Sequence, residues 1–495
     1  MCIAFVLGAL PLYAAPGQMG FFGGINEGVR LPKTTESLLA KVQKKGSTNT
    51  TATAYKEIIF IDGEPVEFSG ELTVRAGVIP DGSELGSYRV IYDVKPTAST
   101  SQTASISRSI TFNVNYRVSG NQTVLDYTVA SWSETLTTPG GAYVLDPRLS
   151  RYDISILEDK TPGVKYYKGD VSGAAVYTGG AGTVTVLTSG SVYGYESAWS
   201  NTETHRLDVS VIQPGWQVQL QVRPSVSVNK TLQYADNEPS LISFPGNYKE
   251  VMSNKPGLRY TLFTLPTHLA DIPREGGTAI ATYNAFEQLI APDLSFLKGN
   301  PAEADIKKLF AMNILSGEPK QYQPSQKITR AQYVTMLTKA AKLPLEPTPK
   351  PAKKNTITFV FPDVTSERPD YQYIMAAYKS GLAVGRSNGH FYADYAIMRQ
   401  EAIVLLVRAL GLGNLGLDPT PATVFTDDAR IADWAKKEIC AAYKIGLIKP
   451  DANGAINPTT EISKAEAAAL VNLFIDYMRD GLGTDYTEHI VNYAN

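Results

Sequence analysis

Three basic side chains recur at nearly even spacing in the C-terminal third of the chain. Arg330, Arg399 and Lys464 each take the second place of a four-residue box, which reads T-R-A-Q, M-R-Q-E and S-K-A-E in turn. Arginine can grip a carboxylate with a bidentate fork, whereas lysine presents a point charge. The boxes therefore predict a repeated site for an anionic partner, with a strength that differs between copies.

The other residues of the boxes have a structural interpretation. Thr329 and Ser463 are favourable N-cap residues, and Gln332 and Glu466 follow three positions later, which is the spacing of a capping box. Each box should therefore begin a helix.

Capping does not explain the cations. The first turn of a helix is an unfavourable place for a positive charge, because the helix macrodipole is positive there. A cation at that place in all three copies suits an anion that also accepts from the free backbone N–H groups of the turn. The alternatives are a solvated surface charge or a salt bridge between repeats. The threefold recurrence favours binding.

The sequence around the boxes repeats as well. The last two copies align without a gap, with Gly-Leu pairs at 381 and 446 and Asn-Gly pairs at 388 and 453, and a more divergent copy contains Asn313–Gly317. Apolar residues at helical spacing precede and follow each box. Each copy is therefore predicted to hold two helices that share one core with its neighbours.

The repeated unit resembles the S-layer homology (SLH) domain, whose pattern opens with F-x-D and W-A and closes with a box similar to I-T-R-A-E. The third copy fits best, with Phe425–Asp427, Trp434-Ala435 and Ile462–Glu466. The second copy has Pro369 in place of that tryptophan, and the first keeps mainly its box. The resemblance covers the region from the first copy to the third.

The resemblance implies a fold and a ligand. SLH domains usually occur in threes, as a pseudo-threefold bundle with grooves between units. They bind a secondary cell-wall polymer, often through a pyruvylated sugar whose carboxylate pairs with the basic box residue. The loops 316–323, 385–390 and 449–454 would supply backbone contacts to the sugar. The residues that the resemblance places at the polymer site, directly or through these loops, are Arg330, Arg399, Lys464, Thr329, Gln332, Glu401, Ser463, Glu466, Gly317, Gly385, Asn388, Asn453 and Trp434.

Ahead of the repeats, apolar and polar residues alternate. Residues 110–118 and 125–129 predict one hairpin, and residues 207–211 and 216–222 predict another. Because no helical period intervenes, we expect antiparallel pairing in a sandwich or an extended meander.

The predicted fold class is a mainly β N-terminal region followed by a separate all-α bundle of three SLH-type helical repeats. The alternation fails near residues 240–257, where we place the boundary of the β-region, and residues 279–297 show a helical pattern. The expected segments are 1–15 for a secretory signal peptide that reads as truncated, 30–270 for an all-β extracellular region, 279–345 for the first repeat with a preceding helix, 355–415 for the second, 424–480 for the third and 481–495 for a tail.

The composition limits the remaining classes of function. A net charge of −2 argues against nucleic acid or any polyanion held by general surface charge, so basic function must be local. After the apolar leader, no apolar run is long enough to span a bilayer as a helix. Cleavage of the leader would remove Cys2 and leave Cys440 unpaired, as a small core residue.

The sequence offers little for catalysis. The histidines are scattered without metal-ligand spacing, and no P-loop occurs. We therefore expect no metal, no cofactor and no enzymatic activity.

Three functional classes remain. The first is a non-catalytic, secreted cell-surface or S-layer protein, anchored by its repeats to an anionic wall polysaccharide. Its β-region would be displayed for adhesion or assembly, through self-association or other surface proteins. The second is a wall-anchored enzyme acting on polysaccharide, and the third is an envelope β-barrel tethered to the wall. Long polar turns disfavour the third, and the lack of a catalytic motif favours the first over the second.

Overall fold

The computed structural model describes residues 23–28, 52–80, 82–97, 104–179, 182–234, 247–264, 269–282, 284–345, 360–416 and 422–486. The expected signal peptide lies outside these ranges.

The N-terminal part forms one antiparallel sheet of 15 strands among the described residues, which is the meander alternative. Its strands are β1 Ile25–Asn26, β2 Ala52–Ile59, β3 Val66–Ala76, β4 Leu85–Pro96, β5 Ser105–Ser119, β6 Gln122–Thr138, β7 Gly141–Leu145, β8 Arg151–Lys160, β9 Val164–Gly179, β10 Gly182–Ser197, β11 Ser200–Gln213, β12 Trp216–Tyr234, β13 Tyr248–Thr264, β14 Leu269–Ala279 and β15 Ala285–Leu289. The strands follow chain order with two exceptions: β7 and β8 both lie between β6 and β9, and β15 pairs with β13 instead of β14. Both predicted hairpins are confirmed, as β5–β6 and β11–β12.

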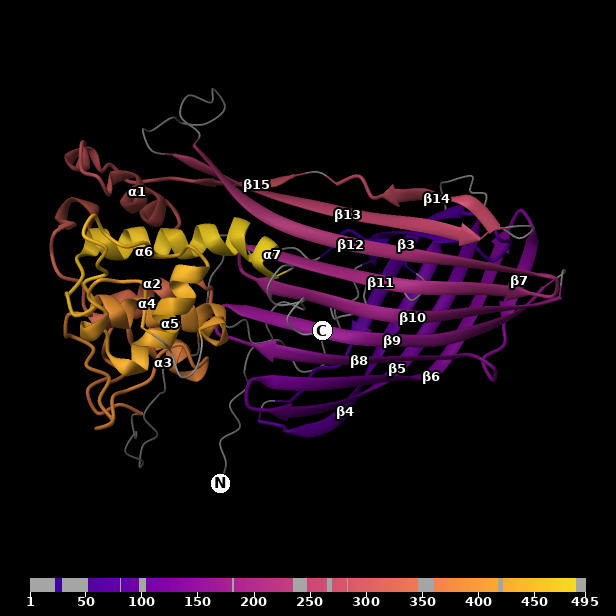
Figure 1. Ribbon diagram of the computed structural model, residues 1–495, viewed down its shortest axis with the longest axis horizontal. Helices are drawn as coiled ribbons and strands as arrows, with labels where there is room; N and C mark the ends of the chain where they lie inside the picture. Colours follow the sequence, from indigo (N-terminus) through magenta and orange to yellow (C-terminus); the bar gives the residue numbers. More distant parts are fainter. Residues whose placement is uncertain are drawn as a thin grey trace.

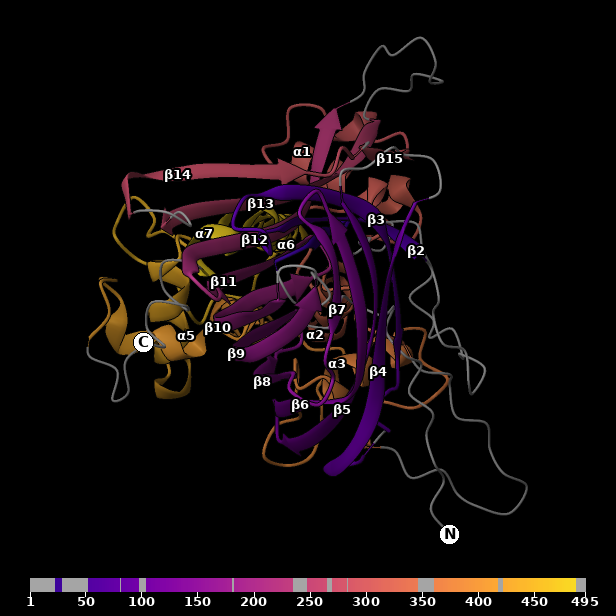
Figure 2. The ribbon, with the colours of Figure 1, turned by 90° about the vertical axis from the view of Figure 1, so that its right-hand side faces the viewer.

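The alternation of the sequence fixes which face of the sheet is inside. In β5, Phe112 and Val114 are fully buried, whereas Asn113 and Asn115 are exposed. The sheet curls back on itself, so its apolar inner face surrounds a core (Figure 2). At the opening, β14 approaches β2, where Lys56 Nζ donates to Thr278 Oγ1 at 3.4 Å.

Two expectations near the end of the sheet are wrong. Residues 285–289 of the segment expected to be a helix form β15, which pairs with residues 248–252 of β13. A partner strand overrides the local helical pattern here. The region around residues 240–257 is not a boundary either, because β13 runs through Pro256 and Gly257, which hide its alternation.

The helices lie at one end of the strands (Figure 1). Each repeat contributes two, as the sequence predicts: α1 Glu303–Ala311 and α2 Arg330–Ala340, α3 Tyr371–Lys379 and α4 Arg399–Leu410, α5 Asp433–Lys444 and α6 Lys464–Asp476. The expected tail begins as helix, because α6 continues through a π-helical turn, Tyr477–Gly481, into α7, Leu482–Asp485. No helix among the described residues is both long and apolar enough to span a membrane.

Bundle and sheet are not separate, contrary to expectation, because they share a core that includes Tyr166, Tyr195 and Trp199 of the sheet. Trp199 Nε1 donates to the carbonyl of Ala340 at 2.7 Å, and the Tyr166 hydroxyl donates to the carbonyl of Leu410 at 2.8 Å. Both acceptors lie at the ends of helices that begin with a box. The sheet therefore holds these helices in place.

Candidate functional site

The three boxes meet around a ring of backbone hydrogen bonds. The N–H of Ile328 donates to the carbonyl of Ile462, that of Ile462 to Ile397, and that of Ile397 to Ile328, each at 3.1 Å. All three isoleucines are buried. Each lies two residues before the basic residue of its box, so the ring fixes the three basic residues relative to one another.

Capping begins the helices, as predicted. Thr329 Oγ1 accepts from the N–H of Gln332, and Gln332 Oε1 accepts from the N–H of Thr329, both at 3.2 Å. Ser463 and Glu466 make the same reciprocal pair, at 3.2 and 2.7 Å. Met398 has no side-chain oxygen, so α4 retains only the second half, in which Glu401 accepts from the N–H of Met398 at 3.1 Å.

The expectation that the first-turn N–H groups are free for an anion is wrong. The N–H of Arg330 donates to the carbonyl of Tyr395 at 2.8 Å, and that of Ala331 donates to Ala393 at 3.0 Å. Both acceptors belong to the next repeat. The equivalent bonds elsewhere are Arg399 to Thr460, Gln400 to Pro458, Lys464 to Gln326 and Ala465 to Pro324. An anion at these helices must therefore be held by side chains.

We call the contact between consecutive repeats a junction and name it by the repeats that meet there. At the 1–2 junction Arg330 is buried, with its Nη2 donating to the carbonyl of Val384 at 3.0 Å. Its Nη1 lies 3.7 Å from Glu401 Oε1, and its Cζ lies 5.1 Å from the centroid of the Phe391 ring. Burial lowers the pKa of Arg330; Glu401 opposes this effect, and the charges of Arg386 and Arg408 add to it.

A second guanidinium shares the same carboxylate. Arg386 Nη2 lies 3.0 Å from Glu401 Oε1, and the Arg386 side chain is 45% exposed. Its Cζ stacks 4.7 Å from the centroid of the Tyr392 ring. The sequence pointed to the loop that holds Arg386 but not to this residue, because its partner is fifteen positions away in the box.

The other two junctions repeat the geometry with different partners. At the 2–3 junction Arg399 Nη2 pairs with Glu466 Oε1. At the 3–1 junction Lys464 Nζ donates to Gln326 Oε1 at 2.6 Å and lies 5.6 Å from the centroid of the Tyr322 ring. Burial lowers the pKa of Lys464. Each cation thus contacts the repeat that follows it around the ring, so the salt-bridge interpretation holds at two junctions.

The remaining predicted residues lie in loops and on one helix. Gly385 packs against Phe361, whose ring a Cβ would approach to 2.7 Å, and Asn388 donates to the Tyr392 hydroxyl. Gly317 has a φ of 106°, which favours glycine. The carbonyl of Asn453 accepts from Thr426 Oγ1 at 3.1 Å. Trp434 is 56% exposed on the first turn of α5.

The aspartates of the two F-x-D segments hold the loops before the boxes. Asp363 accepts from the N–H groups of Phe391 and Tyr392, at 2.8 and 2.6 Å. Asp427 accepts from Ile456 and Asn457, at 3.0 and 2.8 Å. These bonds lower the pKa of Asp363 against the opposing effect of burial. The motif acids therefore act by positioning the loops.

The comparisons agree with this geometry. A family model described as the S-layer homology domain matches residues 297–334, 360–403 and 424–468. The chain is 30% identical over 203 residues to an amylopullulanase of Thermoanaerobacterium thermosulfurigenes, covering 39% of this chain and 10% of that protein. It is 30% identical over 177 residues to the exoglucanase XynX of Acetivibrio thermocellus (35% and 15%), and 29% identical over 176 residues to an S-layer protein of Bacillus licheniformis (35% and 19%). The chain thus spans less than a fifth of these relatives' length.

Proposed function

We propose that this protein, whose residues 297–468 contain three S-layer homology domains, is a non-catalytic surface protein that its repeats anchor to an anionic secondary cell-wall polymer. The domains and the S-layer relatives indicate a secreted, cell-wall-associated protein. The curled sheet would be the part displayed for adhesion or assembly.

The main support for this proposal is the excess of positive charge at the 1–2 junction. Arg330 and Arg386 share the one carboxylate of Glu401. The Nε–H of Arg330 is buried and has no hydrogen-bond partner among the described residues. A carboxylate from an acidic sugar, such as a pyruvylated one, would balance the second cation and form charge-assisted hydrogen bonds. Tyr392, stacked on Arg386, offers a face for the sugar ring.

The three junctions should differ in strength. At the 2–3 junction Arg399 is already neutralised by Glu466, so a ligand carboxylate must compete for it. At the 3–1 junction Lys464 has an amide partner, Gln326, and remains available as a point charge. We therefore rank the 1–2 junction first, the 3–1 junction second and the 2–3 junction third.

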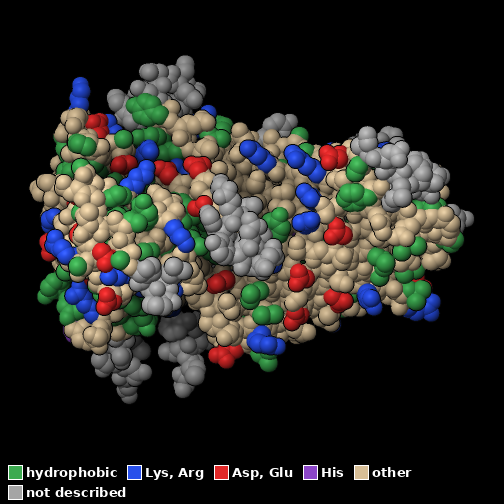
Figure 3. Space-filling model, in the orientation of Figure 1, with side chains coloured by type: hydrophobic (Ala, Val, Ile, Leu, Met, Phe, Trp, Pro, Cys, Tyr) green, Lys and Arg blue, Asp and Glu red, His purple; other side chains and the backbone are tan. Residues whose placement is uncertain are grey.

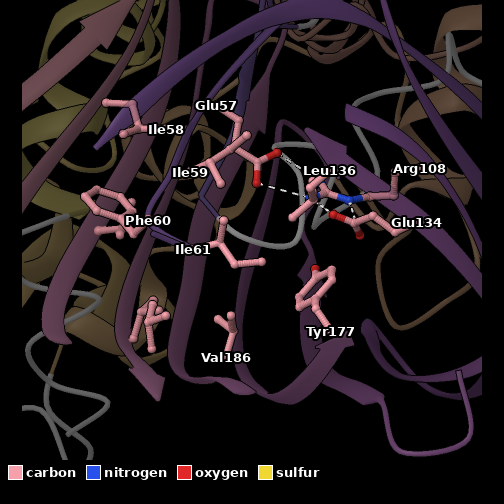
Figure 4. Close-up of a pocket in the computed structure, with 13 residues that line it drawn as sticks. Glu57, Ile58, Ile59, Phe60, Ile61, Arg108, Glu134, Leu136, Tyr177 and Val186 are labelled. Atoms are coloured by element: carbon pink, nitrogen blue, oxygen red, sulfur yellow. Dashed lines mark hydrogen bonds and ion pairs between the residues drawn. The ribbon is translucent and has the colours of Figure 1, made fainter. Parts of the chain in front are cut away.

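A buried pair of glutamates inside the sheet is too enclosed to act on a polysaccharide. Glu57 and Glu134 both pair with Arg108, at 2.9 and 2.8 Å, and all three side chains are at most 2% exposed (Figure 4). They line a cavity of about 40 Å³. Sites for small molecules are several times larger, about 300–1,000 Å³. This pair has no room for a sugar and no free carboxylate.

Wall binding by the full chain tests the proposal. Arg386→Gln combined with Lys464→Gln should weaken binding to purified walls at least tenfold, since each lost charged contact is worth about 1.5–3 kcal/mol. Lys298→Gln, at an exposed site of the bundle, is the matched control and should bind like the parent. Chemical removal of the wall polymer should abolish binding by all three proteins. Unchanged binding by the double variant would reject the assignment of these residues.

The enzyme alternative rests on the two glycosidase relatives. It would require the full chain to release reducing ends from amylose, xylan or wall polysaccharide. A release that one carboxylate substitution abolishes would replace the non-catalytic proposal.

A further inference from the structure

The outer face of the sheet carries a row of three arginines. Arg206 of β11, Arg223 of β12 and Arg259 of β13 are all exposed. The strand register pairs Arg223 with Arg259, and the flanking pairs, Thr204 with Ser225 and Leu207 with Val222, place Arg206 on the other side of Arg223. Because neighbouring strands lie ~4.8 Å apart, the row spans about 10 Å.

Such a row is costly without an anion, since like charges directly opposite each other destabilise a sheet. In the described part of the chain, no carboxylate forms an ion pair with Arg206, Arg223 or Arg259. The Arg223 guanidinium donates to Gln221 Oε1, with its Nε at 2.9 Å. The nearby acid Asp208, two residues from Arg206 on β11, accepts from the same Gln221, at 2.8 Å.

Beside the row the surface is hollowed. The next row of paired residues on the same face, Thr204, Ser225 and Gly257, has small side chains. These residues line an open hollow of about 890 Å³, with Lys255 and Glu275 also at its walls. The hydroxyls of Thr204 and Ser225 lie 3.0 Å apart on its floor. Figure 3 shows Lys and Arg side chains gathered over the strands of this face.

We propose that Arg206, Arg223, Arg259 and Lys255, the arginine strip, bind an extended anionic polysaccharide. Several cations in a line suit a chain with repeated carboxylate or phosphate groups better than one small anion. Guanidinium groups grip both acids bidentately, and the floor hydroxyls match sugar hydroxyls. The hollow is open and shallow, as a polymer that enters and leaves at both ends requires. The strip lies on the sheet and not in the repeats, so it goes beyond the proposed anchoring function.

A strip contact and a repeat contact on one polymer would reinforce each other. Linking two sites converts the second binding event into an intramolecular one and raises avidity without new contacts. The rigid packing of the sheet on the bundle, through Trp199 and Tyr166, keeps the two surfaces at a fixed separation.

The test compares two full-length triple variants. One removes the row, R206Q/R223Q/R259Q, and the control removes three exposed arginines that lie elsewhere on the sheet, R89Q/R117Q/R151Q. The probes are immobilised polygalacturonate, immobilised poly(glycerol phosphate) and neutral dextran. We expect the strip variant to bind the two charged polymers at least tenfold more weakly than the parent, and the control to stay within about threefold. Binding to dextran should be negligible throughout.

Equal binding by strip variant and parent, or an equal loss in the control, would overturn the proposal. Loss of binding to vesicles containing phosphatidylglycerol, with polymer binding retained, would assign the strip to a lipid surface instead. The same comparison in the R386Q/K464Q background separates this proposal from wall anchoring, because the difference between strip and control should persist there. Without polymer, the strip variant should melt at the parent's temperature or above, since removing opposed like charges relieves strain; a lower melting temperature would show that the row is compensated internally.

Discussion

Arg399 pairs with Glu466, and the two residues belong to the boxes of consecutive repeats. Arg330 faces Glu401 in the same way one junction earlier. At these two junctions the basic residue of a box meets the third residue of the next helix's first turn, a glutamate that also caps its own helix. One acid serves two roles, so each helix start depends on its neighbour.

Glu466→Gln should therefore lower stability at neutral pH and make stability less sensitive to acid. Burial raises the pKa of Glu466, but hydrogen bonds from Ser463 and the charge of Arg399 outweigh it, and the net pKa is lowered. A carboxyl group whose pKa is lower in the folded protein stabilises the fold at pH values above its pKa in the unfolded chain. This contribution is lost as the pH falls through its pKa in the folded protein. Because the pair is partly exposed, the loss at neutral pH should be under about 1 kcal/mol. Urea unfolding at pH 7 and pH 3.5 measures it: the gap between parent and variant should shrink at the lower pH.

Much of the local structure follows from the sequence, because its causes are local. Thr329 with Gln332, and Ser463 with Glu466, are four-residue capping signals, and the alternation of residues 110–118 fixes a strand and its buried face. The partners that complete the site are not local. Tyr395, which accepts from the N–H of Arg330, lies in another repeat. Strand β15 forms because β13 offers its edge, which no short window of sequence reveals.

The isoleucine ring should be sensitive to side-chain size. Ile397 is fully buried where the three repeats meet. Ile397→Val should cost about 0.5–1.5 kcal/mol of unfolding free energy and Ile397→Ala about 2–5 kcal/mol, because a cavity opens at the ring. Leu473→Ala, at an exposed site of α6, should cost far less. Chemical denaturation of the three variants gives the order; equal losses at Ile397 and Leu473 would contradict the central role of the ring.

The buried triad of Arg108, Glu57 and Glu134 should be strongly coupled. Glu134→Gln removes a charge that two hydrogen bonds, both at 2.8 Å, tie to Arg108, and Trp132 Nε1 also donates to Glu134, at 3.0 Å. Breaking one partner of a buried pair typically costs 3–5 kcal/mol, whereas replacing all members with hydrophobic residues of similar volume is often nearly neutral. We therefore expect Glu134→Gln to be more destabilising than the triple change of Glu57, Glu134 and Arg108 to Met. The reverse order in thermal unfolding would show that the charges themselves stabilise the sheet.

Trp199 should couple the unfolding of sheet and bundle. Its Nε1 donates to Ala340, and three cations face its ring, with Arg479 Cζ at 4.6 Å, Lys230 Nζ at 5.4 Å and Lys342 Nζ at 5.6 Å from the centroid. Trp199→Phe keeps an aromatic ring but removes the hydrogen bond, at a cost of about 1–3 kcal/mol for the acceptor left buried. Calorimetry should show one transition for the parent. Two separated transitions in the variant would confirm that this contact couples the parts, and one unshifted transition would contradict it.

Because of Lys342, the stability of the interface between sheet and bundle should rise with pH. Burial, reinforced by the charge of Lys230, lowers the pKa of Lys342 from its ordinary 10.5 to about 7. Between these two values the unfolded chain binds the proton and the folded chain does not, so unfolding takes up a proton and stability rises with pH, by at most about 1.4 kcal/mol per unit. Below pH 7 both states are protonated, and the penalty of the buried charge is fully present. Lys342→Met should therefore stabilise the protein most at pH 6 and least at pH 10. Lys298→Met, at an exposed site, provides the control for other titrating groups. A difference between parent and Lys342→Met that stays constant from pH 6 to pH 10 would show that Lys342 keeps its ordinary pKa in the folded protein.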